Sequence, residues 1–230
     1  MIRIIGFDAD DTLWHNENIF ERAQERYRRL LAKYHPAAEV DVALFATEMR
    51  NFKRYGYGVK GFMLSTVETA IELTKGEISA REIREIIALG QEMLAHPVEL
   101  LPDVAAVVPA LARDYRLLLI TKGDLHHQES KIAASGLAAH FSAVEILSEK
   151  DGAAYERVLR RHGVALAEFV MVGNSLKSDI LPVLALGGAG VHIPYHILWQ
   201  HEHAEPVPQD TPRFRCIERL AELPALLSGL

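Results

Sequence analysis

Short runs of consecutive apolar residues recur along the chain, separated by stretches with helical periodicity. Continuous apolar character is typical of strands that are covered on both faces of a parallel sheet. The apolar runs predict strands at residues 3–7, 116–121, 143–147, 169–172, 190–193 and 214–217. The stretches between the later runs predict helices at residues 128–134, 152–162, 176–186 and 220–227. This alternation favours a doubly wound α/β sheet.

One long region interrupts the alternation. Residues 16–95 show helical periodicity and long charged faces but no convincing strand. The predicted helices in this region are 19–34, 42–55, 61–74 and 79–94. We therefore predict an α/β core made of residues 1–15 and 96–230, with an all-helical cap inserted at 16–95. Residues 201–213 are polar and rich in proline, and this composition predicts a surface loop.

Composition excludes several other classes of protein. The 230 residues, 49% of them hydrophobic, can form a sizeable core, and the net charge of −6 gives no basic field for nucleic acid or an anionic membrane. The single cysteine, Cys216, excludes an intramolecular disulfide. No apolar segment approaches the roughly 20 residues of a membrane span. We expect a cytoplasmic protein without a signal peptide.

Polar side chains follow four successive predicted strands. In open α/β sheets, ligands bind beyond the carboxyl ends of the strands. The strands are followed in turn by a carboxylate-rich segment, a threonine, a lysine, and an amide with a further carboxylate. These residues are Asp8, Asp10, Asp11 and Thr12, then Thr121, then Lys150, then Asn174 and Asp179. Such a set suits a phosphoryl group and a divalent cation. Three acids within four residues would otherwise belong on an open loop.

In these motifs the sequence resembles the haloacid dehalogenase-like hydrolase superfamily, and within it the phosphatases. The signature of the superfamily is DxDxT after the first strand, then Ser or Thr, then Lys, then GDxxxD or GDxxxxD. The segments Asp8–Thr12 and Gly173–Asp179, with Thr121 and Lys150 between them, match in type, order and approximate spacing. The superfamily also inserts a helical cap after its first motif, so the resemblance covers essentially the whole chain.

The resemblance implies a role for each catalytic residue. Asp8 would attack phosphorus and form an aspartyl-phosphate that water then hydrolyses. Asp10 would protonate the leaving alkoxide and later accept a proton from water. Thr121 would hydrogen-bond a phosphoryl oxygen, and Lys150 would supply a positive charge to the nucleophile and the phosphate.

It also implies a magnesium site and a phosphate-binding set. The expected Mg²⁺ ligands are the Asp8 carboxylate, the Asp10 backbone carbonyl and Asn174, with Asp179 bound directly or through water. The expected substrate contacts are Thr12, Thr121, Lys122, Gly123 and Lys150, with Lys60 from the cap.

Two positions depart from the pattern of the superfamily. Asn174 stands where an aspartate is usual, and Asp151 follows Lys150 where proline is common. An amide oxygen can still bind Mg²⁺, but the loss of one negative charge predicts weaker binding.

Three of these residues keep an alternative interpretation. Lys60 lies in the glycine-containing segment 55–61, which is equally compatible with a solvent-exposed turn. Asp179 could be an acid favoured by the first turn of a helix. Lys150 competes with Lys122, Lys131 and Lys177, and is preferred because it alone follows the third strand at the expected place.

The predicted function is Mg²⁺-dependent hydrolysis of a small phosphorylated metabolite. The alternatives are a phosphosugar mutase or phosphotransferase of the same superfamily, or a catalytically weak binding protein derived from it. Haloacid dehalogenation is disfavoured because the expulsion of halide needs no second acid, whereas Asp10 is present. A response-regulator receiver domain is disfavoured by the order of the motifs and by the long helical insertion. The sequence does not indicate the substrate or the oligomeric state.

Overall fold

The computed structural model describes residues 1–230, which form two compact units. The first, here called the sheet unit, contains residues 1–17, 98–122 and 128–230. The second, the helical unit, contains residues 18–97 and 123–127. None of the helices combines the length and the apolar character that crossing a membrane requires.

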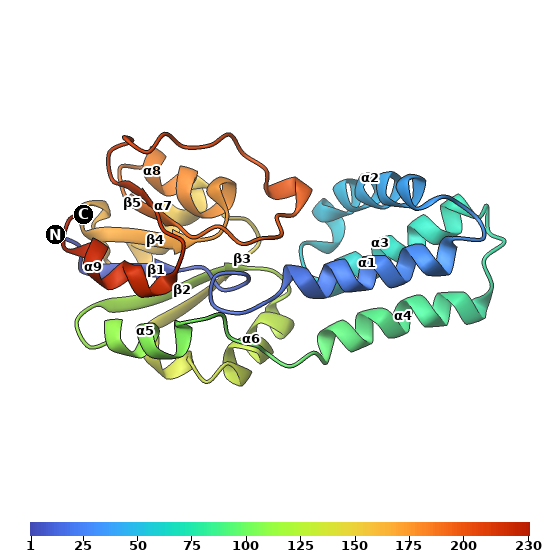
Figure 1. Ribbon diagram of the computed structural model, residues 1–230, viewed down its shortest axis with the longest axis horizontal. Coiled ribbons are helices and arrows are strands. Elements are labelled where there is room, and N and C mark those ends of the chain that lie inside the picture. The colour runs from blue at the N-terminus through green and yellow to red at the C-terminus, as the bar shows by residue number, and fades with distance from the viewer. The chain divides into compact units, whose positions relative to one another are not determined.

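The sheet unit is built on a six-stranded sheet in the order β3-β2-β1-β4-β5-β6 (Figure 1). All five strand pairs are parallel. The strands are β1 (Ile4–Phe7), β2 (Arg116–Lys122), β3 (Ala143–Leu147), β4 (Phe169–Gly173), β5 (Ala189–His192) and β6 (Phe214–Cys216). The predicted α/β class with a doubly wound parallel sheet is therefore confirmed. Because the strands are parallel, their carboxyl ends share one edge of the sheet.

Alternate residues of the central strands enter two separate cores. In β2, Leu117 and Leu119 belong to one core, whereas Leu118 and Ile120 belong to the other. Helices α5 (Val104–Leu111) and α9 (Leu223–Leu227) cover the first face, and α7 (Gly152–Arg161) and α8 (Leu181–Ala185) cover the second. Burial on both faces explains why these strands are continuously apolar in sequence.

Helix α5 lies in a segment for which the sequence predicted no element. Its eight residues, VAAVVPAL, are apolar throughout and include Pro109, so they show neither a polar face nor an uninterrupted helical pattern. Pro109 has no backbone N–H, so this short helix loses only the one hydrogen bond that residue 109 would otherwise donate. The helix predicted at residues 176–186 is also different, since a π-helical turn at Leu176–Ile180 precedes α8.

The helical unit contains α1 (Glu17–Leu31), α2 (Ala37–Tyr55), α3 (Val59–Leu73) and α4 (Ala80–Leu94). The helices at these four places were predicted, although α2 begins earlier than expected. Ser79 and Glu82 form a reciprocal capping box that fixes the start of α4. The unit has its own core, which includes Tyr27, Leu44 and Ile86. The assignment of residues 16–95 as a cap stays a prediction.

Candidate active site

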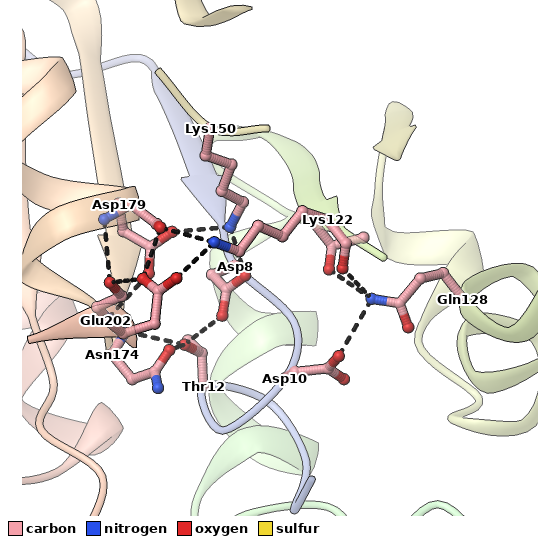
Figure 2. A network of polar contacts seen from close by, with 12 residues as sticks. Asp8, Asp10, Thr12, Lys122, Gln128, Lys150, Asn174, Asp179 and Glu202 are labelled. Carbon is pink, nitrogen blue, oxygen red and sulfur yellow. Dashed lines mark hydrogen bonds and ion pairs between the residues drawn. The ribbon is translucent and has the colours of Figure 1, made fainter. Parts of the chain in front are cut away.

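An ion-paired centre lies at the carboxyl ends of the strands. Asp8 directly follows β1, and Lys150 lies between β3 and α7. The Lys150 ammonium donates to Asp8 Oδ1 at 2.5 Å and to Asp179 Oδ1 at 2.7 Å (Figure 2). All three residues are buried. The structure thus brings together a candidate nucleophile and the lysine that the sequence selected from four.

The second oxygen of Asp8 lies where residues from two strand ends meet. The Thr12 hydroxyl donates to Asp8 Oδ2 at 3.0 Å and lies 3.3 Å from Asn174 Oδ1. The Asn174 backbone N–H donates to the Thr12 hydroxyl at 3.1 Å. Oxygen atoms of Asp8 and Asn174 therefore converge on a single hydroxyl group.

Burial dominates the ionisation of Asp8. Removal from water raises the pKa of Asp8 from 3.8 to about 7, even though the Lys150 ammonium acts in the opposite direction. The negative charge of Asp179 raises it further. Near neutral pH the Asp8 carboxyl can therefore gain or lose a proton.

Asp10 has a separate set of partners. Its carboxylate accepts two hydrogen bonds from Lys131 Nζ, at 2.6 and 2.8 Å, one from Trp14 Nε1 at 2.6 Å and one from Gln128 Nε2 at 3.1 Å. Burial alone would raise the pKa of Asp10, but Lys131 and the hydrogen bonds more than offset this, so its pKa is lowered. In this conformation Asp10 is held as a carboxylate.

The sequence did not predict the contacts of Lys131 and Gln128 with Asp10. They are three residues apart on α6 (Leu125–Ala134), which follows β2, so they share one face of that helix. The i, i+3 spacing of an amide and an ammonium behind Thr121 was a usable signal. It was overlooked because Lys131 was considered only as a competitor of Lys150.

Asp11 has hydrogen-bond partners different from those of Asp8 and Asp10. It has a left-handed backbone, with φ of 63°, and accepts hydrogen bonds from the backbone N–H groups of Asn16 and Glu17. Burial raises the pKa of Asp11 to about 8, although these bonds oppose the shift. The three acids of the first motif thus have three different sets of partners, and this separation explains how they coexist within four residues.

Thr121 lies at the end of β2 and is buried beside Asp10. Gln128 Nε2 donates to Thr121 Oγ1 at 2.8 Å and to the Lys122 carbonyl at 2.9 Å. Since the same amide nitrogen reaches Asp10 Oδ2, Gln128 connects the second predicted motif to the first. Gly123, the next residue in the β2–α6 connection, has a positive φ of 143°, which glycine adopts without the strain of a Cβ atom.

The end of β4 turns sharply around Asp179. Ser175 N donates to Asp179 Oδ2 at 3.0 Å, and the backbone N–H groups of Asp179 and Ile180 both reach the Ser175 carbonyl. A Cβ atom at Gly173 would lie 2.3 Å from Asp179 Oδ2. This π-helical turn, a geometry that is frequent at functional sites, therefore needs glycine at position 173 to accommodate the carboxylate.

The prediction that residues 201–213 form only a surface loop is wrong at Glu202. Glu202 is buried, and its carboxylate accepts hydrogen bonds from Lys122 Nζ and from the hydroxyls of Ser175 and Ser178. Its polar and proline-rich surroundings gave no signal for this burial. Lys122, predicted as a substrate contact, is thus ion-paired within the sheet unit.

Lys60 belongs to the helical unit. Its ammonium lies 3.0 and 3.1 Å from the two carboxylate oxygens of Asp124. Lys60 is therefore paired with an acid, and a role in binding an anionic substrate stays a prediction.

The oxygen-rich donor set fits a hard divalent cation. Asp8 and Asn174 present oxygen atoms close to one hydroxyl, and the two carboxylates of Asp8 and Asp179 share the single ammonium of Lys150. No group of three or more His, Cys, Asp and Glu side chains is arranged to hold a metal ion. A cation would consequently depend on the Asn174 amide and backbone oxygens in addition to carboxylates.

Comparison with known proteins gives a consistent result. The family model described as haloacid dehalogenase-like hydrolase matches residues 2–187. A crystal structure of a haloacid dehalogenase-like family hydrolase from Xanthomonas campestris is 43% identical to the chain, with a TM-score of 0.89. That similarity covers 99% of this chain and 91% of the other.

Two more distant matches also cover most of both chains. N-acylneuraminate-9-phosphatase from Rattus norvegicus is 27% identical, over 100% of this chain and 95% of the rat protein. A magnesium-bound HAD-hydrolase structure from Bacillus subtilis is 20% identical with a TM-score of 0.65, and the match covers 98% of each chain. At that identity, the second match supports the fold alone.

Proposed function

Because the chain belongs to the haloacid dehalogenase-like hydrolase family, we propose that it is a Mg²⁺-dependent phosphatase of small phosphomonoesters. The observation that carries the proposal is the buried contact of Lys150 with Asp8 and Asp179. It supplies a carboxylate nucleophile and a fixed positive charge at one point of the sheet edge. The phosphatase name of the rat relative supports the same reaction class.

In the proposed first step, an Asp8 carboxylate oxygen attacks the phosphorus of the ester. The new bond from Asp8 to phosphorus forms as the bond to the alkoxide breaks, which leaves an aspartyl-phosphate. Lys150 remains beside the nucleophile and offsets part of the negative charge of the phosphoryl group. Bound Mg²⁺, with Asp8 and Asn174 among its ligands, would lower the repulsion between two anions.

Asp10 would move the protons in both steps. It donates a proton to the departing alkoxide and takes one from the water that attacks the aspartyl-phosphate. The lowered pKa of Asp10 favours the second role. The first role requires that Asp10 gain a proton when the ester binds, since a nearby dianion favours the neutral form of the acid.

Asp10 also separates this proposal from dehalogenation. Halide leaves without a proton, so a second carboxylate that accepts four hydrogen bonds would have no use in that reaction. The anionic carboxylate held by Lys131, Trp14 and Gln128 is instead a built feature of the site. The mutase and phosphotransferase alternatives differ only in whether a second hydroxyl replaces water.

Release of phosphate from 4-nitrophenyl phosphate in MgCl₂ tests the reaction class. The wild-type chain should release phosphate, and Asp8→Asn should lose all detectable turnover while it retains its circular dichroism spectrum. A panel of phosphomonoesters that includes N-acylneuraminate 9-phosphate then addresses the substrate. Activity that survives in Asp8→Asn would contradict the nucleophile, and transfer to an added alcohol without hydrolysis would favour a phosphotransferase.

A further inference from the structure

The connection between β5 and β6 contributes one carboxylate, that of Glu202, to the hydrogen-bond network of the candidate active site. Glu202 ends a short helical turn, Gln200–Glu202, and is 9% exposed, whereas the next residue, His203, is exposed. A buried carboxylate within a polar connection carries an energetic cost unless it is paired. The contacts of Glu202 show what it is paired with.

Both oxygens of Glu202 are used. Oε1 accepts from Lys122 Nζ at 2.5 Å, and Oε2 accepts from the Ser175 and Ser178 hydroxyls at 2.5 and 2.6 Å. Ser175 N in turn donates to Asp179 Oδ2, and Asp179 is bound to Lys150. Glu202 is therefore continuous, through hydrogen bonds, with the centre that contains Asp8.

The connection is fastened at two further points. The Tyr195 hydroxyl lies 2.6 Å from His15 Nδ1, and Lys177 Nζ donates to the His201 carbonyl at 2.6 Å. His15 follows the first motif, and Lys177 lies on the turn that contains Asp179. Both contacts hold the part of the connection that leads into Glu202, and so they help to fix the place of its carboxylate.

Lys122 is the residue that this arrangement positions. It follows Thr121 directly, and its side chain is only 16% exposed. Its ammonium donates to Ser178 Oγ at 2.9 Å as well as to Glu202, and the half-exposed Glu149 lies 3.6 Å away. Figure 2 shows the Lys122 side chain entering the same network as Lys150 and Asp179.

Loss of the Glu202 charge would leave the Lys122 ammonium without its closest counter-charge. The half-exposed Glu149 would remain 3.6 Å away, and the buried carboxylates of the network, Asp8 and Asp179, are already held by Lys150. An ammonium attracted to them would compete for the nucleophile. Glu202 thus gives Lys122 a counter-charge of its own, and the positive charge of Lys122 stays within the network.

We propose that Glu202 is a positioning residue that holds the Lys122 ammonium as a second cationic contact for the phosphoryl group. This inference rests on the proposed phosphatase function. It identifies a side-chain role for Lys122, beside the fixed charge of Lys150. A phosphate dianion that enters the centre meets two ammonium groups, one paired with the nucleophile and the other held from the β5–β6 connection.

A double-mutant cycle tests the pairing. The variants are Lys122→Met, Glu202→Gln and the double variant, with Glu205→Gln as a matched control at an exposed site in the same connection. Calorimetric titration with inorganic phosphate gives Kd, and 4-nitrophenyl phosphate in MgCl₂ gives kcat and KM. Thermal unfolding of each variant measures its stability.

Lys122→Met should weaken phosphate binding by roughly tenfold, as expected for the loss of one charge-assisted hydrogen bond. Glu202→Gln should shift Kd in the same direction, and the double variant should be no weaker than Lys122→Met alone. KM should rise more than kcat falls in each case, and Glu202→Asp should recover part of the affinity. Glu205→Gln should behave as the wild type.

Two results would overturn the inference. One is a phosphate affinity that does not change in Lys122→Met. The same holds for Glu202→Gln if that protein is folded and has lost thermal stability but not phosphate affinity. The other is strictly additive losses, which would mean that the two residues act independently. If the wild type hydrolyses 4-nitrophenyl phosphate but Lys122→Met binds phosphate as tightly as the wild type does, this inference is rejected and the proposed function is retained. Lys122-dependent binding without any turnover would reject the phosphatase proposal alone.

Discussion

Lys131 places its ammonium against both carboxylate oxygens of Asp10, at 2.6 and 2.8 Å. This ion pair is distinct from the one between Lys150 and Asp8. Two lysines from different parts of the chain therefore pair with the two aspartates of the first motif. The two carboxylates consequently differ in acidity, because the pKa of Asp8 is raised whereas that of Asp10 is lowered. In the proposed reaction Asp8 must therefore be ionised before it attacks, and Asp10 must gain a proton before it protonates the leaving group.

Asp10→Asn should discriminate between leaving groups. Nitrophenolate leaves without a proton, whereas a simple alkoxide needs one, so turnover of an alkyl phosphate should fall by about 10²–10⁴ and that of 4-nitrophenyl phosphate should fall less. Steady-state kinetics with both esters measures the ratio. Equal losses on both substrates would contradict the role of Asp10 in protonating the leaving group.

Lys131→Met should shift the ionisation of Asp10 upward. With the ammonium removed, burial is no longer offset, and the pKa of Asp10 rises. The limb of the kcat/KM profile that reports Asp10 should then move to higher pH, and the shift should disappear in an Asp10→Asn background. An unmoved profile would show that the Lys131 contact does not persist during turnover.

Binding of Mg²⁺ should depend on pH through Asp8. The pKa of Asp8 is about 7 in the metal-free protein, so below that pH a proton competes with the cation and apparent affinity should fall by about tenfold per unit. Titration calorimetry at pH 6 and pH 8 measures the difference. Removal of the metal with EDTA should abolish turnover at both pH values, and activity that persists would contradict the metal requirement.

Asn174→Asp should tighten the metal site. A carboxylate adds a negative charge beside the Thr12 hydroxyl that already joins positions 8 and 174. The Mg²⁺ concentration for half-maximal activity should therefore decrease. An unchanged activation curve would count against placing Asn174 among the ligands.

Glu48 in the helical unit should make stability dependent on pH. Burial raises the pKa of Glu48 from 4.5 to about 7, so the folded state retains a proton that the unfolded state has lost. Stability due to Glu48 is then full below pH 4.5 and decreases as pH rises toward 7, by about 3 kcal/mol in total. Urea unfolding at pH 5 and pH 8 should show this decrease in the wild type relative to Glu48→Gln. A constant difference between the two proteins would contradict it.

The sequence predicted the central strands well because β1, β2 and β4 are largely apolar and buried on both faces. The order of the motifs along the chain also placed Lys150 after β3, and in the structure its ammonium contacts Asp8. Helix α5 was missed because a short apolar segment with Pro109 has no helical periodicity to detect. The roles of Lys131 and Glu202 depend on contacts across 121 and 80 residues of chain, respectively, and no local pattern specifies such contacts.

The close approach of Gly173 to Asp179 limits which residues natural variation can place at position 173. A single methyl group at position 173 would displace the Asp179 carboxylate, and with it one of the two anions that orient Lys150. Descendants of this chain could therefore lose catalysis through a mutation that alters no reacting group. Alanine at this position would mark such an inactive lineage even where every acid and lysine had been retained.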